Sequence, residues 1–118
     1  MRQPPAIDGY GGGGFRVAGV WRPGSLLILE DQPSDWRPTS LADLTLDDIR
    51  PILAAPPGAL EFVVLGTGPI QALPPRPIRD AIRLANLGLE FMASEEAAKL
   101  HNVLSSEGRL FATALIAV

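Results

Sequence analysis

The sequence has 118 residues, which is the length of one domain. Hydrophobic residues make up 47% and charged residues 19%, so the chain has enough apolar side chains to form a core and is not predicted to be disordered. The formal net charge of -3 argues against nucleic acid as a partner, because neutralising phosphates requires a surplus of Lys and Arg. The absence of cysteine excludes disulfides, thiolate catalysis and cysteine-based zinc sites.

Residues 1–14 are interpreted as a flexible arm that ends in a glycine turn. Gly9, Gly11 and Gly14 formally satisfy the G-x-G-x-x-G pattern of dinucleotide-binding loops. That pattern requires a strand before it and a helix after it. Here no strand pattern precedes the glycines, and residues 15–21 follow with the alternation of a strand. The glycines are therefore not predicted to bind a nucleotide.

The sequence gives no indication of export or of a membrane-spanning segment. Its beginning lacks both the apolar stretch of a signal peptide and the pattern of a transit peptide. The longest apolar run, residues 110–118, is far shorter than the roughly 20 residues that a transmembrane helix needs. We expect a cytoplasmic protein that is not an integral membrane protein.

The first half of the chain is predicted to contain a hairpin, a short strand and a helix. Two strand patterns, at 15–21 and 25–29, flank a turn at 22–24 and together predict a β-hairpin. Trp36 is placed in a short third strand. Thr45 and Asp48 have the spacing of a capping box, which predicts the start of a helix. That helix is expected to be short or bent, because Pro51 lies inside it.

The second half alternates strand, helix, strand, helix, strand. The expected elements are a strand at 60–65, a helix from Pro77 that ends at Gly88, a strand at 89–92, a helix that Ser94 caps and Gly108 ends, and a buried strand at 110–118. Alternation of this kind predicts an α/β domain with helices packed on a sheet. With no repeat and no boundary visible, residues 1–118 are predicted to form a single α/β domain with about three helices.

The loop Gly66-Thr67-Gly68 is one candidate ligand-binding feature. It follows a buried strand, where α/β proteins commonly bind ligands, and its glycines would allow backbone N–H groups to approach an anion. Arg79 and Arg83, with Arg76 nearby, share a helix close to it in sequence and could complete a basic pocket. The alternative is a tight turn followed by the solvated face of an amphipathic helix.

Polar residues near the last helix-to-strand junction are the second candidate feature. Asn102, Glu107 and Arg109 lie there, and Glu107 could form an ion pair with Arg109. We expect this junction and the 66–68 loop to border one site. His101 is the only histidine; with Ser105 four residues later it forms no complete catalytic or metal-binding set, so no catalytic residue, no metal site and no cofactor are predicted.

Three pieces of the sequence, in their order and spacing, resemble one protein family. They are Ile7-Asp8-Gly9-Tyr10 with the segments at 15–19 and 24–27, then Val64-Leu65-Gly66-Thr67-Gly68, then Met92 with the segments at 97–104 and 107–109. Together they are similar to the small proteins that carry domain of unknown function 498. The chain departs from the family where members usually have Thr and Tyr and it has Leu100 and His101, and a Thr often stands where it has Ser94.

The resemblance implies a three-layer α/β fold with a mixed central sheet, and it implies no established enzyme activity and no cofactor. Mitochondrial members of the family act as non-catalytic assembly factors that work with a partner protein on peripheral parts of respiratory complex I. The first hypothesis is therefore a non-enzymatic assembly or scaffolding factor for a respiratory or membrane protein complex. The second is a protein, with or without enzyme activity, that binds a small anion or metabolite at the 66–68 loop and the nearby arginines.

Overall fold

The computed structural model describes residues 4–118. Its elements in chain order are β1 (Ile7–Tyr10), β2 (Gly14–Val17), β3 (Val20–Pro23), β4 (Ser25–Leu29), β5 (Gln32–Trp36), a 3-10 turn (Leu41–Asp43), α1 (Leu46–Leu53), β6 (Phe62–Gly66), α2 (Arg76–Leu84), β7 (Gly88–Met92), α3 (Ser94–Ser106) and β8 (Phe111–Leu115).

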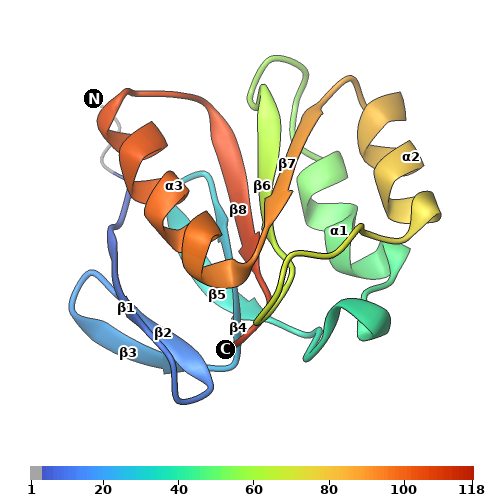
Figure 1. The fold of residues 1–118 in the computed structure, drawn as a ribbon. Helices are drawn as coiled ribbons and strands as arrows, with labels where there is room; N and C mark the ends of the chain where they lie inside the picture. The colour runs from blue at the N-terminus through green and yellow to red at the C-terminus, as the bar shows by residue number, and fades with distance from the viewer. Residues whose placement is uncertain (1–3) are drawn as a thin grey trace.

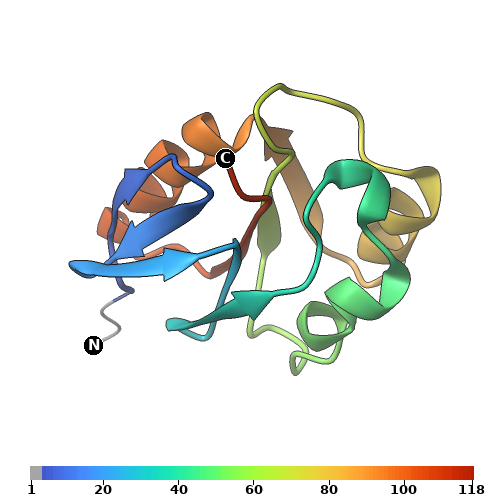
Figure 2. The same cartoon turned by 90° about the horizontal axis from the view of Figure 1, so that it is seen from below.

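The architecture has three layers around a mixed central sheet (Figure 1). The central sheet has five strands in the order β5-β4-β8-β6-β7. β4 is antiparallel to both of its neighbours, while β6 is parallel to β7 and β8. α1 and α2 cover one face, and α3 covers the other together with the small three-stranded sheet β1-β2-β3 (Figures 1 and 2). The three-layer α/β fold with a mixed sheet and an N-terminal hairpin is thus confirmed.

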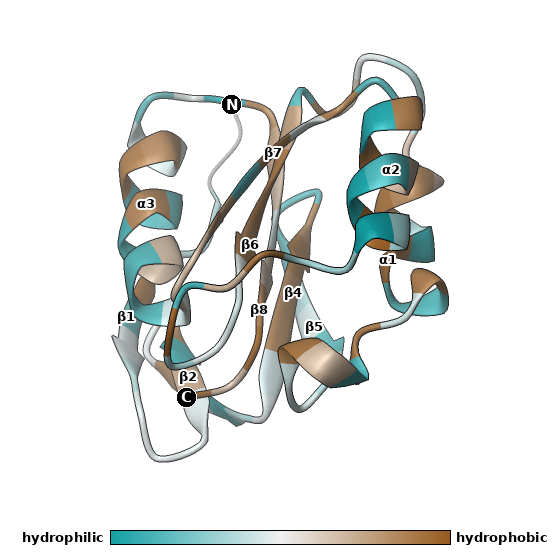
Figure 3. Ribbon diagram, turned by 45° about the vertical axis from the view of Figure 1, so that its right-hand side comes forward, coloured by the Kyte–Doolittle hydropathy of each residue, from teal (hydrophilic) through white to brown (hydrophobic). Residues whose placement is uncertain are grey.

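Each face of the central sheet has its own apolar core. Side chains alternate along a strand, so β6 sends Val63 and Leu65 towards α1 and α2, and Val64 towards α3. All five residues of β8 are buried, as expected for a central strand that is covered on both faces. Figure 3 shows the apolar residues concentrated along these inner strands.

The N-terminal hairpin lies earlier in the chain than the predicted one. The pattern at 15–21 is broken by a turn at Ala18 and Gly19, whose φ angles are 49° and 81°, and the hairpin joins β2 to β3. β4 does not pair with β3 but belongs to the central sheet. A turn at Ala18 is difficult to predict from sequence, because a non-glycine residue rarely adopts positive φ.

Two helix boundaries also differ from the predicted ones. α2 ends at Leu84, and Asn86, not Gly88, takes the left-handed backbone with φ 65°. Gly88 instead begins β7. Ser94 is the first residue of α3 and makes no capping hydrogen bond to the helix. The capping box of Thr45 and Asp48 at the start of α1 is present as expected.

Part of the segment interpreted as a flexible arm forms a strand, and residues 1–3 of that segment lie outside the described residues. Residues 7–10 form β1, which pairs with β2. The main-chain N–H of Ile7 donates to Oδ1 of Asn102, and Nδ2 of Asn102 donates back to the carbonyl of Ile7, at 2.9 and 2.8 Å. This two-bond contact, made across 95 residues of sequence, fixes β1 against α3.

Candidate functional site

The loop at 66–68 is closed by the protein's own side chains. It lies at the carboxyl ends of the parallel strands, between β6 and β7, whose following helices cover opposite faces of the sheet. That crevice is where open α/β sheets commonly bind ligands. Here it holds Ser94, whose Oγ accepts from the N–H of Gly68 at 2.9 Å and donates to the carbonyl of Ile116 at 2.6 Å. Ser94 has no exposed surface, so the loop offers no cradle of free N–H groups.

The remaining groups around this loop also bind within the protein. The N–H of Thr67 donates to Met92, and its hydroxyl donates to the carbonyl of Ile70 at 2.6 Å. Arg79 is half-buried and donates through Nε to the carbonyl of Pro74, while Arg83 is exposed and pairs with Asp80 on its own helix. The arginines therefore do not converge on the loop, and the basic pocket is not formed.

The histidine and the asparagine of α3 are internal connectors. His101 is 1% exposed; its Nδ1 lies 2.7 Å from the hydroxyl of Thr113 and its Nε2 lies 2.8 Å from the carbonyl of Pro5. Asn102 holds the backbone of Ile7, as described above. Both side chains tie the N-terminal segment to α3, a role that depends on contacts too distant in sequence to predict.

The junction at 107–109 lies at the opposite end of the sheet from the 66–68 loop. Phe62 pairs with Phe111 and Gly66 pairs with Leu115, so the length of β6, roughly 13 Å, separates the two features. The expectation that they border one site is wrong. Glu107 is exposed, and Arg109 forms an ion pair of 3.7 Å with Glu61 and lies 5.0 Å above the ring of Phe62.

The carboxyl with the most shifted pKa belongs to a structural network. Asp48 accepts two hydrogen bonds from Arg37, and the N–H and hydroxyl of Thr45 also donate to it. These bonds lower the pKa of Asp48 to about 2, with the Arg37 contact as the largest cause. Trp36 closes the network by donating to the Asp48 carbonyl at 3.0 Å. The shifted pKa is thus explained by the anchoring of α1 and not by a reaction.

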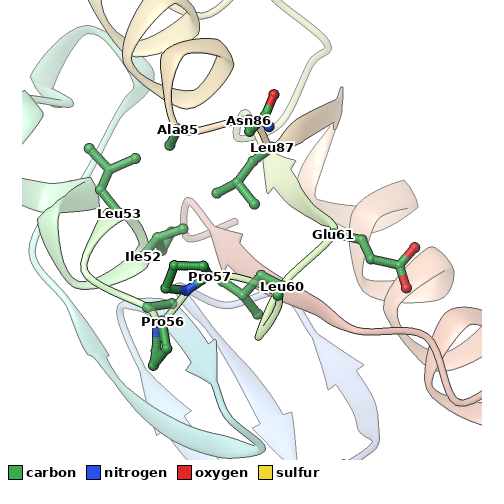
Figure 4. A pocket seen from close by; sticks show the side chains of 11 residues that line it. Ile52, Leu53, Pro56, Pro57, Leu60, Glu61, Ala85, Asn86 and Leu87 are labelled. Atoms are coloured by element: carbon green, nitrogen blue, oxygen red, sulfur yellow. The ribbon is translucent and has the colours of Figure 1, made fainter.

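An open apolar pocket lies near the amino ends of β6 and β7. Its volume is about 600 Å³, and it is formed where α1 and α2 end (Figure 4). Most of the lining side chains are apolar: Ile52, Leu53, Ala55, Pro56, Pro57, Leu60, Ala85 and Leu87. Glu61 also lines it, but Figure 4 shows its carboxylate turned away, towards the other face of the sheet. We call this the proline-rim pocket.

A second pocket, of about 560 Å³, lies on the other face of the sheet beside α3. Phe62, Leu100 and Leu104 supply apolar surface, and Glu61, Glu90 and Arg109 supply charge. Gly88 also lines it and contributes no side chain there. We call this the acidic pocket, because Arg109 is the one cation among its lining residues.

The start of β7 separates the two pockets. Leu87 lines the proline-rim pocket, and the next residue, Gly88, lines the acidic pocket. β7 is the last strand of the central sheet and has a strand neighbour on one side only within the described chain. Figure 3 shows it at the front of the sheet, between α3 and the pair α1 and α2. This strand edge with a pocket on each face is the candidate functional site.

Of the residues that line the two pockets, only Arg109 is among the candidate site residues predicted from the sequence. The pattern Pro56-Pro57-Gly58 indicates only the end of a helix, and nothing in the pattern of 89–92 distinguishes an edge strand from a central one. One available signal was Glu90, because a charged residue in a short strand is a common feature of sheet edges.

The chain matches over residues 7–116 the family described as "Protein of unknown function (DUF498/DUF598)". It belongs to this family. An uncharacterized protein of Rhodobacter capsulatus is 34% identical over 110 residues, which cover 93% of this chain and 82% of that protein. The "13 kDa major membrane protein" of Francisella tularensis is 43% identical over 58 residues, covering 49% of this chain and 45% of that protein.

A solved structure, that of an outer membrane protein from Bartonella henselae, has the same fold as this chain. The TM-score is 0.88 at 30% identity, and the match covers 98% of this chain and 96% of that one. None of the helices among residues 4–118 is long and apolar enough to cross a membrane. The same residues contain no group of three or more His, Cys, Asp or Glu side chains that could hold a metal ion.

Proposed function

We propose that this protein is a non-enzymatic binding protein, an assembly or scaffolding factor for a respiratory or membrane protein complex. The observation that carries the proposal is the proline-rim pocket, an open apolar surface of about 600 Å³ at the exposed end of the sheet. An apolar hollow of this kind suits the apolar side chains of a partner protein, which bury their surface on binding.

The polar side chains that would be the first candidates for chemistry support this proposal. Ser94, His101 and Asn102 form hydrogen bonds that hold the fold together, and Ser94 and His101 are fully buried. Their hydrogen-bonding groups are used inside the protein, while the open pocket is lined mainly by groups that neither donate nor accept protons.

The names of two relatives support a membrane-associated partner. One related protein is called a major membrane protein and another an outer membrane protein. A chain of this fold can be recovered with membranes by binding a membrane-bound complex at its periphery. Mitochondrial proteins of the family that this sequence resembles work in that way.

The test is capture of a partner from detergent-solubilised membranes of the native host, using the full chain with an affinity tag. Leu53→Gln places a polar amide in the proline-rim pocket and is expected to reduce recovery of the captured complex at least tenfold. Leu73→Gln is the matched control, because Leu73 is 61% exposed and lies outside the pocket. Both variants are first checked by urea unfolding. Equal recovery with all three proteins, or recovery of no defined complex, contradicts the proposal.

A further inference from the structure

We propose that the partner adds a basic, extended segment to the free edge of β7 as a sixth strand of the central sheet. This inference rests on the proposed function and specifies how the partner binds. The evidence is the direction of the β7 backbone groups, the pockets on both sides of the strand, and the charge of Glu90.

The backbone of β7 presents unpaired groups along its outer edge. The N–H of Gly88 donates to the carbonyl of Glu61, and the carbonyl of Met92 accepts from the N–H of Thr67. Gly88 and Met92 therefore direct their backbone groups towards β6. Because the direction alternates along a strand, Leu89 and Phe91 direct their N–H and C=O groups away from the sheet. An extended peptide that pairs with these groups would continue the ladder.

The two pockets match the two faces of an added strand. Side chains of a strand point alternately to opposite faces of the sheet. Next to Leu87 and Leu89, side chains on one face would meet the proline-rim pocket. On the other face, next to Gly88 and Glu90, they would meet the acidic pocket. The side chains of one bound strand would thus bury apolar surface in the proline-rim pocket and reach the acidic pocket at the same time.

The charged side chain of β7, Glu90, favours one kind of partner strand over another. Glu90 is exposed, lies in the middle of β7, faces the acidic pocket, and has no ion pair with any residue between 4 and 118. Antiparallel pairing of two copies centred on the middle of β7 would bring two Glu90 carboxylates face to face, and like charges directly opposite are destabilising. A strand with Lys or Arg opposite Glu90 gains attraction instead. The edge therefore favours a different protein, with a pattern of apolar, basic and apolar residues, over a second copy of this chain.

The experiment uses the full chain and peptides of eight residues. Peptides selected from a random display library are expected to carry an apolar-basic-apolar pattern. The best one is synthesised with a fluorophore, and its Kd is measured by anisotropy. N-methylation at alternate peptide positions is expected to weaken binding at least tenfold in one register and to leave it unchanged in the other, because only every second N–H faces β7. Selection of no peptide, or N-methyl effects that do not depend on register, overturns the proposal.

A charge reversal on the protein tests the role of Glu90. Glu90→Lys is expected to weaken the selected peptide about tenfold and to bind a peptide whose basic residue is replaced by Glu more tightly. Glu96→Lys, the same change on an exposed residue of α3 outside the acidic pocket, is the control and is expected to leave both affinities unchanged. Equal affinities for the Glu90 and Glu96 variants overturn the charge assignment.

The outcome also distinguishes this inference from the proposed function. If Leu53→Gln abolishes capture of the membrane complex while Glu90→Lys and peptide N-methylation have no effect, the partner binds the pocket without adding a strand. If neither Leu53→Gln nor Glu90→Lys reduces capture, both proposals fail.

Discussion

Replacement of Ser94 by alanine tests whether this residue is a helix cap or a connector between the 66–68 loop and β8. If Ser94 only capped α3, replacing it by alanine would lower the unfolding free energy by about 1 kcal/mol. In the structure its Oγ binds the N–H of Gly68 and the carbonyl of Ile116, and the residue has no exposed surface. Ser94→Ala leaves both groups buried without a partner, at about 1–3 kcal/mol each. The expected loss of unfolding free energy is therefore about 2–6 kcal/mol.

The assay is urea unfolding followed by far-UV circular dichroism, with Ser106→Ala as the control. Ser106 is an exposed residue at the end of the same helix, and its hydroxyl bonds only to the carbonyl of Val103 three residues before it, so its removal is expected to change the unfolding free energy by less than about 0.5 kcal/mol. A domain of this size has about 5–15 kcal/mol of stability, so the Ser94 variant should still fold at low urea. A loss of 1 kcal/mol or less for Ser94→Ala would refute the connector role.

Three further predictions concern other parts of the fold. Leu115→Ala should lower the unfolding free energy by about 2–5 kcal/mol in urea titration, because the side chain is fully buried; a loss below about 1 kcal/mol would contradict that burial. The pKa of Asp48 is lowered to about 2, mainly by Arg37, so the ionised carboxylate adds about 2 kcal/mol to the unfolding free energy above about pH 4, and this contribution is lost as the pH falls towards 2. The difference in unfolding free energy between wild type and Asp48→Asn should therefore shrink over that pH range. A difference that stays constant would contradict the role of the Asp48 carboxylate. Asn102→Ala should make the amides of β1 exchange faster with solvent, because the two bonds to Ile7 are lost; unchanged exchange would argue against the clamp.

The parts of the fold that sequence alone predicted are those determined by local patterns. The strand at 60–65, the helix that begins near Pro77 and the helix that ends at Gly108 follow from hydrophobic period and turn residues within a few positions. The capping box of Thr45 and Asp48 is equally local, and it is present. Such signals need no knowledge of which segments meet in space.

The features that the sequence did not predict depend on contacts between segments that are distant in the chain. Ser94 has the composition and position of a cap, yet its hydroxyl binds residues 26 and 22 positions away. Asn102 was proposed as a ligand-binding residue, and its amide oxygen and nitrogen each form a hydrogen bond with the backbone of Ile7, 95 positions away. In both cases the residue type correctly indicates that the side chain forms hydrogen bonds. The groups to which it bonds could not be identified without knowing which segments of the chain meet in the fold.

The crevice at the carboxyl end of the central sheet is filled by the protein's own side chains. A Cβ atom on Gly66 would lie 2.7 Å from Oγ of Ser94 and 2.8 Å from Leu115, so the loop, α3 and β8 are packed too closely there to admit a ligand. The amino end of β7 differs, because pockets of about 600 and 560 Å³ lie on the two faces of a strand whose outer edge has no strand neighbour among residues 4–118. The free volume at the amino end of β7, and not the polar side chains at the carboxyl end, therefore supports the proposed binding surface.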